Sequence, residues 1–131
     1  MLDWLKKIVL SVRCASKGIR YVVATERNIR VHLIVFALVV MASMLLRIPR
    51  IEFLLVLAIS ALMISFELTN TAIERLADKV SPEYNAQIGI VKDIMAGAVL
   101  VSSIFAIIIG LIIFTEPLLK LLALCEFQWV K

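Results

Sequence analysis

Apolar residues form three long runs separated by short polar stretches. The runs cover residues 31–46, 51–66 and 94–115, and each consists mainly of Leu, Ile, Val, Ala, Phe and Met. As helices they are about 24–33 Å long, close to the ~30 Å hydrocarbon core of a bilayer. The pattern therefore predicts an all-α integral membrane protein with three transmembrane helices.

Polar stretches set the expected boundaries of these helices. Pro49 cannot continue the first helix, and the segment from Ser81 to Asn85 interrupts the second, which leaves a short connection over 80–91. A tail begins at Glu116-Pro117 and resembles a second interfacial helix. We expect one domain over 1–131, divided into a surface helix and flank (1–30), spanning helices (31–46, 51–79 and 90–115) and an amphipathic tail (116–131) anchored by Phe127 and Trp129.

The N-terminal segment 2–23 has the pattern of an amphipathic helix lying in the membrane interface. Apolar residues recur at helical spacing, basic residues form a polar face, and Trp4 suits the level of the lipid headgroups. The apolar positions are Leu2, Leu5, Ile8, Val9 and Val12, and the basic ones are Lys6, Lys7, Arg13, Lys17 and Arg20. The alternative is a basic flank that only fixes the topology.

Composition and charge support a membrane protein. Hydrophobic residues make up 63% of the 131 residues, against ~45–50% in soluble domains. The net charge of +4 could indicate nucleic acid, but the basic residues border apolar spans, so no nucleic-acid partner is expected. The N-terminal segment and the second connection hold ten of the fourteen basic residues, which predicts a cytoplasmic N-terminus without a cleaved signal. Cys14 and Cys125 are too few for a disulfide framework.

The second spanning helix carries a polar stripe. Glu67, Asn70, Glu74 and Asp78 fall within an arc of about 80° on one helix face. Intramembrane carboxylates are rare and mark functional sites, and a cation would relieve the repulsion between stacked acids. Carboxylate oxygens favour Mg²⁺. The stripe therefore predicts a magnesium-dependent site.

More charge is expected at the same membrane level. Glu26 precedes the first span, and Lys92 and Asp93 precede the third. Carboxylates, a metal and an ammonium group suit phosphoryl transfer, with a carboxylate at the membrane edge as base for a lipid hydroxyl. An ion or proton relay remains an alternative. So does a structural role, in which the acids pair with Arg75, Lys79 and Lys92; no P-loop, dinucleotide fingerprint or zinc spacing is present.

Two strings carry a family resemblance. The string E-L-T-N-T-A-I-E-R-L-A-D (67–78), followed by K-D-I-M-A-G-A-V (92–99), resembles the prokaryotic diacylglycerol kinase family, and the likeness covers about residues 5–115. The run 25–32 is more similar to the undecaprenol kinase branch, whereas Cys14 and Asn85 depart from the pattern of the Gram-negative diacylglycerol kinase. The resemblance implies a homotrimer in the bacterial plasma (inner) membrane. It also implies an enzyme that uses ATP and Mg²⁺ to phosphorylate a membrane lipid alcohol, undecaprenol slightly preferred over diacylglycerol.

The same resemblance assigns roles to individual residues. Glu67 matches the general base, and Glu26 and Glu74 match the carboxylates that hold Mg²⁺ with ATP. The remaining residues of the implied nucleotide site are Lys7, Asn70, Glu83, Tyr84, Asn85, Lys92 and Asp93. A trimer also has a physical argument: three helices of one chain are not expected to shield Glu67, Asn70 and Glu74 from lipid on all sides.

Overall fold

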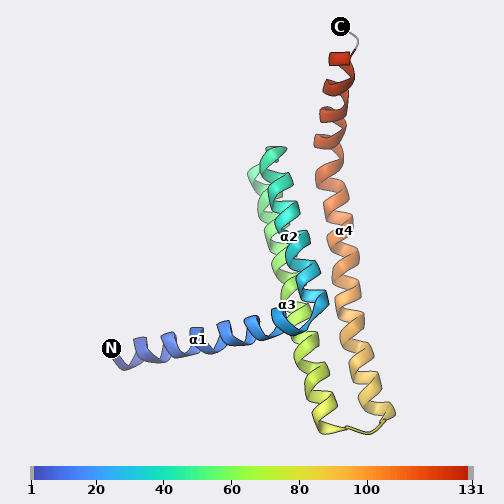
Figure 1. Ribbon diagram of the computed structural model, residues 1–131. Coiled ribbons are helices and arrows are strands. Elements are labelled where there is room, and N and C mark those ends of the chain that lie inside the picture. Colours follow the sequence, from blue (N-terminus) through green and yellow to red (C-terminus); the bar gives the residue numbers. More distant parts are fainter. Residues whose placement is uncertain (1, 130–131) are drawn as a thin grey trace.

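The computed structural model of the chain consists of helices joined by short connections (Figure 1). It describes the backbone of residues 2–129 and the side chains of residues 3–123. The helices are α1 (Leu2–Thr25), α2 (Arg27–Leu45), α3 (Arg50–Val80) and α4 (Ala86–Trp129). The expectation of an all-helical chain is confirmed.

Three of these helices, α2, α3 and α4, form a bundle. α3 packs against both α2 and α4, and the contact with α4 is the more extensive. α2, α3 and α4 are each long and apolar enough to cross a membrane, as the apolar runs predicted. α1 leaves the bundle sideways and contacts it only near its C-terminal end (Figure 1). The apolar side of α1 is exposed in the chain, and its location in the membrane interface stays a prediction.

A single residue separates α1 from α2. Glu26 has extended backbone angles, with φ −105° and ψ 129°, and α2 begins at the next residue. The first spanning helix therefore starts at Arg27, earlier than the expected residue 31. This break turns the chain from the surface helix into the bundle and places the Glu26 carboxylate at the corner.

The turn between α2 and α3 closes the helix end with a Schellman motif. The N–H of Arg47 donates to the Met44 carbonyl at 3.3 Å, and the N–H of Ile48 donates to the Ser43 carbonyl at 3.2 Å. This motif places Arg47 in the left-handed region, with φ 51°. Pro49 then precedes the first residue of α3, which confirms the expected end of the first span.

The connection and the tail differ from expectation. α4 begins at Ala86, so the non-helical connection is only 81–85 rather than 80–91. α4 also continues through Pro117 without interruption, so the expectation of a separate helix from Glu116 is wrong. A proline removes one backbone donor, a loss that the neighbouring helical turns tolerate. An ion pair of 2.6 Å joins Glu116 to Lys120 on either side of Pro117. The side chains of Cys125, Phe127 and Trp129 lie outside the described part.

Arg47 gives a test of the turn. Replacing it by Gly should raise the free energy of unfolding by roughly 0.5–1 kcal/mol, because relief of ~1–2 kcal/mol of left-handed strain outweighs the extra entropy of the unfolded chain. Thermal unfolding in detergent measures the change. Arg47→Ala removes the same side chain but keeps the strain, and it should give no gain. Equal midpoints for the Gly and Ala variants would contradict the left-handed assignment.

Candidate functional site

A polar column runs along one face of α3 and becomes more exposed toward the 81–85 connection. The column consists of Glu67, Asn70, Glu74 and Asp78, which span about 16 Å along a continuous helix. The side chains of Glu67 and Asn70 are buried, Glu74 is half-buried and Asp78 is exposed. The column therefore leads from the interior of the bundle to its charged end.

The inner part of the column is covered by the chain itself. Glu67 is 3% exposed and Asn70 is 8% exposed, although no second copy is present. The expectation that partner subunits are needed to shield Glu67 and Asn70 from lipid is wrong, because packing of α3 between α2 and α4 already covers both side chains. Within residues 3–123 the Glu67 carboxylate takes part in no ion pair.

Asn70 has one satisfied and one unsatisfied polar atom. Its Nδ2 donates to Oε1 of Glu74 at 3.1 Å. Its Oδ1 is buried and lacks a hydrogen-bond partner among the described residues. Leaving a buried acceptor unsatisfied costs about 1–3 kcal/mol. A donor or a cation arriving at this point would remove that cost.

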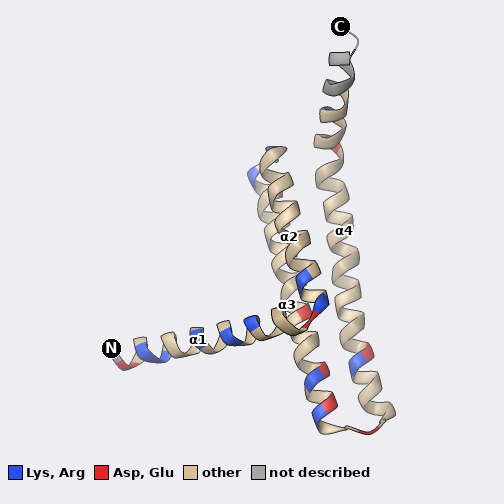
Figure 2. Cartoon of the chain, in the orientation of Figure 1, with Lys and Arg blue, Asp and Glu red and all other residues tan. Residues whose placement is uncertain are grey.

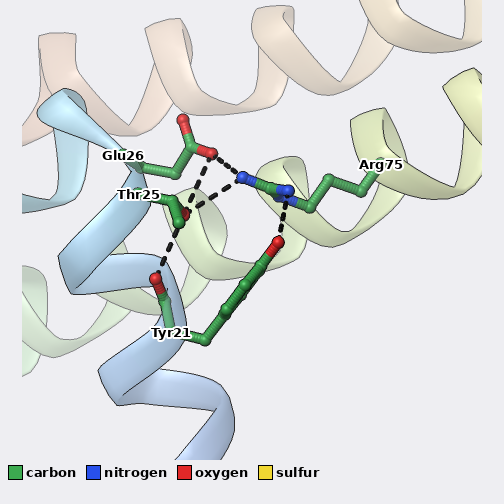
Figure 3. A network of polar contacts seen from close by, with 4 residues as sticks. All are labelled: Tyr21, Thr25, Glu26 and Arg75. Atoms are coloured by element: carbon green, nitrogen blue, oxygen red, sulfur yellow. Dashed lines mark hydrogen bonds and ion pairs between the residues drawn. The ribbon is translucent and has the colours of Figure 1, made fainter.

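Glu26 and α3 are joined by Arg75 (Figure 3). Nη2 of Arg75 donates to Oε1 of Glu26 at 2.5 Å and to Oγ1 of Thr25 at 3.1 Å. Nη1 donates to the Tyr21 hydroxyl at 2.7 Å, and the guanidinium lies 4.8 Å from the centroid of the Tyr21 ring. Since Arg75 follows Glu74 in the chain, this contact holds Glu26 at the level of the middle of the polar column along α3.

Part of this arrangement was predictable. The sequence indicated that Arg75 and Lys92 could pair with nearby acids, and both do so. The roles of Tyr21 and Thr25 were missed. Tyr21 and Thr25 are four residues apart and therefore lie on one face of α1, directly before Glu26. This spacing is the sequence signal that could have predicted a contact face.

The outer part of the column is bridged by α4. Nζ of Lys92 donates to Oδ1 of Asp78 at 3.0 Å, so α3 and α4 are joined close to the 81–85 connection. Asp93 is exposed beside Lys92. The predicted convergence of these residues at one end of the bundle agrees with the charge distribution in Figure 2, where the charged residues of α3 and α4 gather toward the connection.

Other predicted residues do not join the column within one chain. Lys7 is exposed on α1, about 27 Å along the helix axis from Thr25. Glu83 is exposed, and Tyr84 is 95% exposed in the connection. Asn85 caps α4: its Oδ1 accepts the N–H of Gln87 at 2.9 Å and that of Ile88 at 3.3 Å.

The side-chain oxygen atoms of the column decide whether a magnesium ion fits this site. The described side chains contain no cluster of three or more His, Cys, Asp or Glu suited to a metal. Mg²⁺ bound with a nucleotide needs only one or two carboxylates, because phosphate oxygens and water supply the other ligands. The Glu74 carboxylate beside the unsatisfied Oδ1 of Asn70 provides such hard oxygen atoms. These residues therefore fit a nucleotide-bound Mg²⁺.

An apolar cavity reaches the level of the inner end of the column, although none of its lining residues belongs to the column. It has a volume of about 490 Å³ between α3 and α4, and its lining includes Phe66, which directly precedes Glu67, as well as Gly97 and Ala98. A second cavity of about 390 Å³ lies among α2, α3 and α4 and includes the half-buried His32. Apolar space thus begins at Phe66, one residue before the buried carboxylate along α3.

Comparison with known proteins identifies similar sequences. The family model described as prokaryotic diacylglycerol kinase matches residues 13–114. A diacylglycerol kinase of Synechocystis sp. is 37% identical over 116 residues, covering 88% of this chain and 66% of the relative, slightly under two thirds of its length. An undecaprenol kinase of Bacillus subtilis is 35% identical over 104 residues, covering 79% of this chain and 85% of the relative. Lys7 and the tail lie outside the match to the family model.

Asn85 provides a test of the helix cap at the start of α4, next to the outer end of the column. Asn85→Ala should lower the free energy of unfolding by about 1 kcal/mol, because the N–H groups of Gln87 and Ile88 lose their acceptor. Amide hydrogen exchange at these two residues should also accelerate. Asn85→Asp keeps a side-chain oxygen and is the matched control. Unchanged exchange in the Ala variant would rule out the cap.

Proposed function

The chain belongs to the prokaryotic diacylglycerol kinase family, and we propose that it is an ATP-dependent kinase that phosphorylates the hydroxyl of a membrane lipid alcohol. The observation that carries this proposal is the buried Glu67 carboxylate, which has no ion-pair partner among the described side chains and directly follows Phe66, a lining residue of an apolar cavity. A lipid hydroxyl can reach such a group from the bilayer. Farther along α3, Glu74 offers a carboxylate for a nucleotide-bound metal, and the Lys92 ammonium of α4 pairs with Asp78.

Glu67 acts as the general base in this proposal. Its carboxylate takes the proton of the lipid hydroxyl, and the lipid oxygen attacks the γ-phosphorus of ATP. The bond between that phosphorus and the β,γ-bridging oxygen breaks, ADP leaves, and the proton remains on Glu67 until it is released to solvent. We infer direct transfer, because the lipid hydroxyl that Glu67 deprotonates is itself the nucleophile, and Glu74 is assigned to the metal rather than to attack on phosphorus.

The outer column positions the nucleotide. Glu26 and Glu74 would hold Mg²⁺, which neutralises charge on the triphosphate, and Asn70 lies beside them. Lys92 contributes an ammonium group for phosphate, and Asp93 lies next to it. Following the family resemblance, we assign Glu83, Tyr84, Asn85 and Lys7 to the nucleotide site. Lys7 is too far along α1 to reach the column of its own chain, so this assignment requires another copy.

The lipid substrate is proposed from the cavity and the relatives. A cavity of about 490 Å³ with an apolar lining accommodates hydrocarbon rather than a polar acceptor. The two relatives are named for diacylglycerol and for undecaprenol. We favour undecaprenol, because the segment 25–32 is more similar to the undecaprenol kinase branch.

Assembly and topology complete the proposal. We propose a homotrimer in the bacterial plasma membrane with the N-terminus and the 81–85 connection in the cytoplasm. The distribution of basic residues supports this orientation. Native mass spectrometry of the protein in mild detergent should give three chains per particle. A monomer that retains kinase activity would contradict the trimer and would remove Lys7 from the site.

Glu67 is the residue to test first. Purified protein in detergent is incubated with labelled ATP, Mg²⁺ and either undecaprenol or diacylglycerol. Glu67→Gln should lower the rate of lipid phosphorylation by about 10²–10⁴-fold, because the amide cannot accept the proton. Glu52→Gln, on the same helix but at its opposite end, is the control and should retain the rate.

The outcomes separate the parts of the proposal. Absence of phosphorylation with both lipids in the wild-type protein would reject the kinase and favour an ion relay or an assembly role for the polar column. Full activity of Glu67→Gln would reject only the general base. A faster rate with diacylglycerol than with undecaprenol would reverse the substrate preference.

A further inference from the structure

The corner between α1 and α2 holds a carboxylate whose geometry is set from another helix. Glu26 is the only residue between the two helices: its backbone N–H still donates to the Val22 carbonyl of α1 at 2.8 Å, but its backbone angles are extended. A side chain at such a corner has many accessible orientations. In the structure, one orientation is selected by contacts with Arg75 of α3 (Figure 3).

The guanidinium of Arg75 is itself fixed by several contacts. It donates to oxygens of Tyr21, Thr25 and Glu26, and it stacks on the Tyr21 ring. A planar guanidinium with several partners orients a carboxylate more firmly than a single ammonium group does. The Thr25 hydroxyl, at 3.4 Å from Oε1 of Glu26, also donates to the Tyr21 carbonyl at 3.0 Å. Two residues of α1, one residue of α3 and Glu26 at the corner thus form one network.

The network holds Glu26 by one oxygen. Both the hydrogen bond and the ion pair with Arg75 involve Oε1. Oε2 makes no hydrogen bond or ion pair within the described part of the chain. Oε2 is therefore the atom available to a metal. The second proposed metal ligand, Glu74, directly precedes Arg75 in α3. Arg75 sets the position of Glu26 relative to the polar column.

We propose that Arg75 is a positioning residue: it fixes the Glu26 carboxylate, and with it the end of α1, against the metal-binding part of α3. This inference rests on the proposed function for the role of Glu26. The structural half, the attachment of α1 to α3, does not depend on catalysis. Arg75 touches no reacting atom in this proposal and acts through Glu26.

Arg75 has two opposing effects that variants can separate. Its positive charge repels a cation bound at Glu26, whereas its positioning of the carboxylate favours that cation. Arg75→Lys retains the charge but loses the planar fork, and Arg75→Gln loses the charge. If positioning dominates, both variants should raise the Mg²⁺ concentration for half-maximal rate by about 10–100-fold, the usual range for residues that orient a metal ligand. If charge dominates, Arg75→Gln should lower that concentration and Arg75→Lys should leave it unchanged, and the proposal is then wrong.

A second measurement does not depend on activity. Spin labels are placed on Cys14 of α1 and on Val80→Cys at the end of α3, with Cys125 replaced by Ser, in nucleotide-free protein in nanodiscs. Pulsed electron paramagnetic resonance then gives the distribution of distances between the labels. Arg75→Gln should broaden this distribution, because the end of α1 loses its attachment to α3. An unchanged distribution would overturn the structural half of the proposal.

One further variant controls for general damage, and a second tests the network at Tyr21. Lys79→Gln removes a positive charge one turn farther along α3, and this residue forms no ion pair among the described side chains. It should alter neither the Mg²⁺ dependence nor the label distances. Tyr21→Phe keeps the ring but loses the hydroxyl that accepts from Arg75, and it should shift the Mg²⁺ dependence a few-fold in the same direction as Arg75→Gln.

The design distinguishes the two proposals. If wild-type protein phosphorylates no lipid but Arg75→Gln broadens the label distances, the kinase function fails and the attachment stands. If wild-type protein is active and the Arg75 variants keep its Mg²⁺ dependence, the positioning role fails and the kinase function stands. If Arg75→Gln does not fold, Tyr21→Phe carries the test, and wild-type behaviour of that variant rejects the proposal.

Discussion

The structure depends on covering polar groups that lie within a membrane-spanning helix. A carboxylate or an amide exposed to hydrocarbon costs several kcal/mol. α3 carries Glu67 and Asn70 on one face, and both are buried because α3 lies against α2 and α4. The short turn after α2 and the short connection before α4 keep these helices adjacent. The bundle is therefore built around a polar face rather than a large apolar core.

The charged part of the site depends on the corner at Glu26. One extended residue interrupts the helix, sends α1 away from the bundle and leaves a carboxylate at the level of Arg75. The next contact outward is the ion pair between Asp78 and Lys92. Along about 16 Å of α3, the environment changes from a buried acid to exposed charge. This gradient suits a reaction between a lipid acceptor and a water-soluble phosphate donor.

The apolar exterior is consistent with the same division of roles. Many large apolar side chains of α2, α3 and α4 are exposed, and in a bilayer these surfaces contact lipid or another copy. The cavity lined by Phe66 opens within this apolar environment and reaches the level of Glu67 along α3. The large share of hydrophobic residues thus places the protein in lipid, where the proposed acceptor is also dissolved. A few polar residues determine the chemistry.

The sequence by itself determined the three spans, the helix ends near the prolines at 49 and 82, the shared face of the polar column and the family. These features depend on local backbone preference and on periodicity within one helix. Tertiary structure decided that one chain covers Glu67 and that Arg75 binds Glu26. It also showed that α4 continues past Pro117. Which side chains from distant segments meet depends on how the helices pack against each other, and no single-helix pattern contains that information.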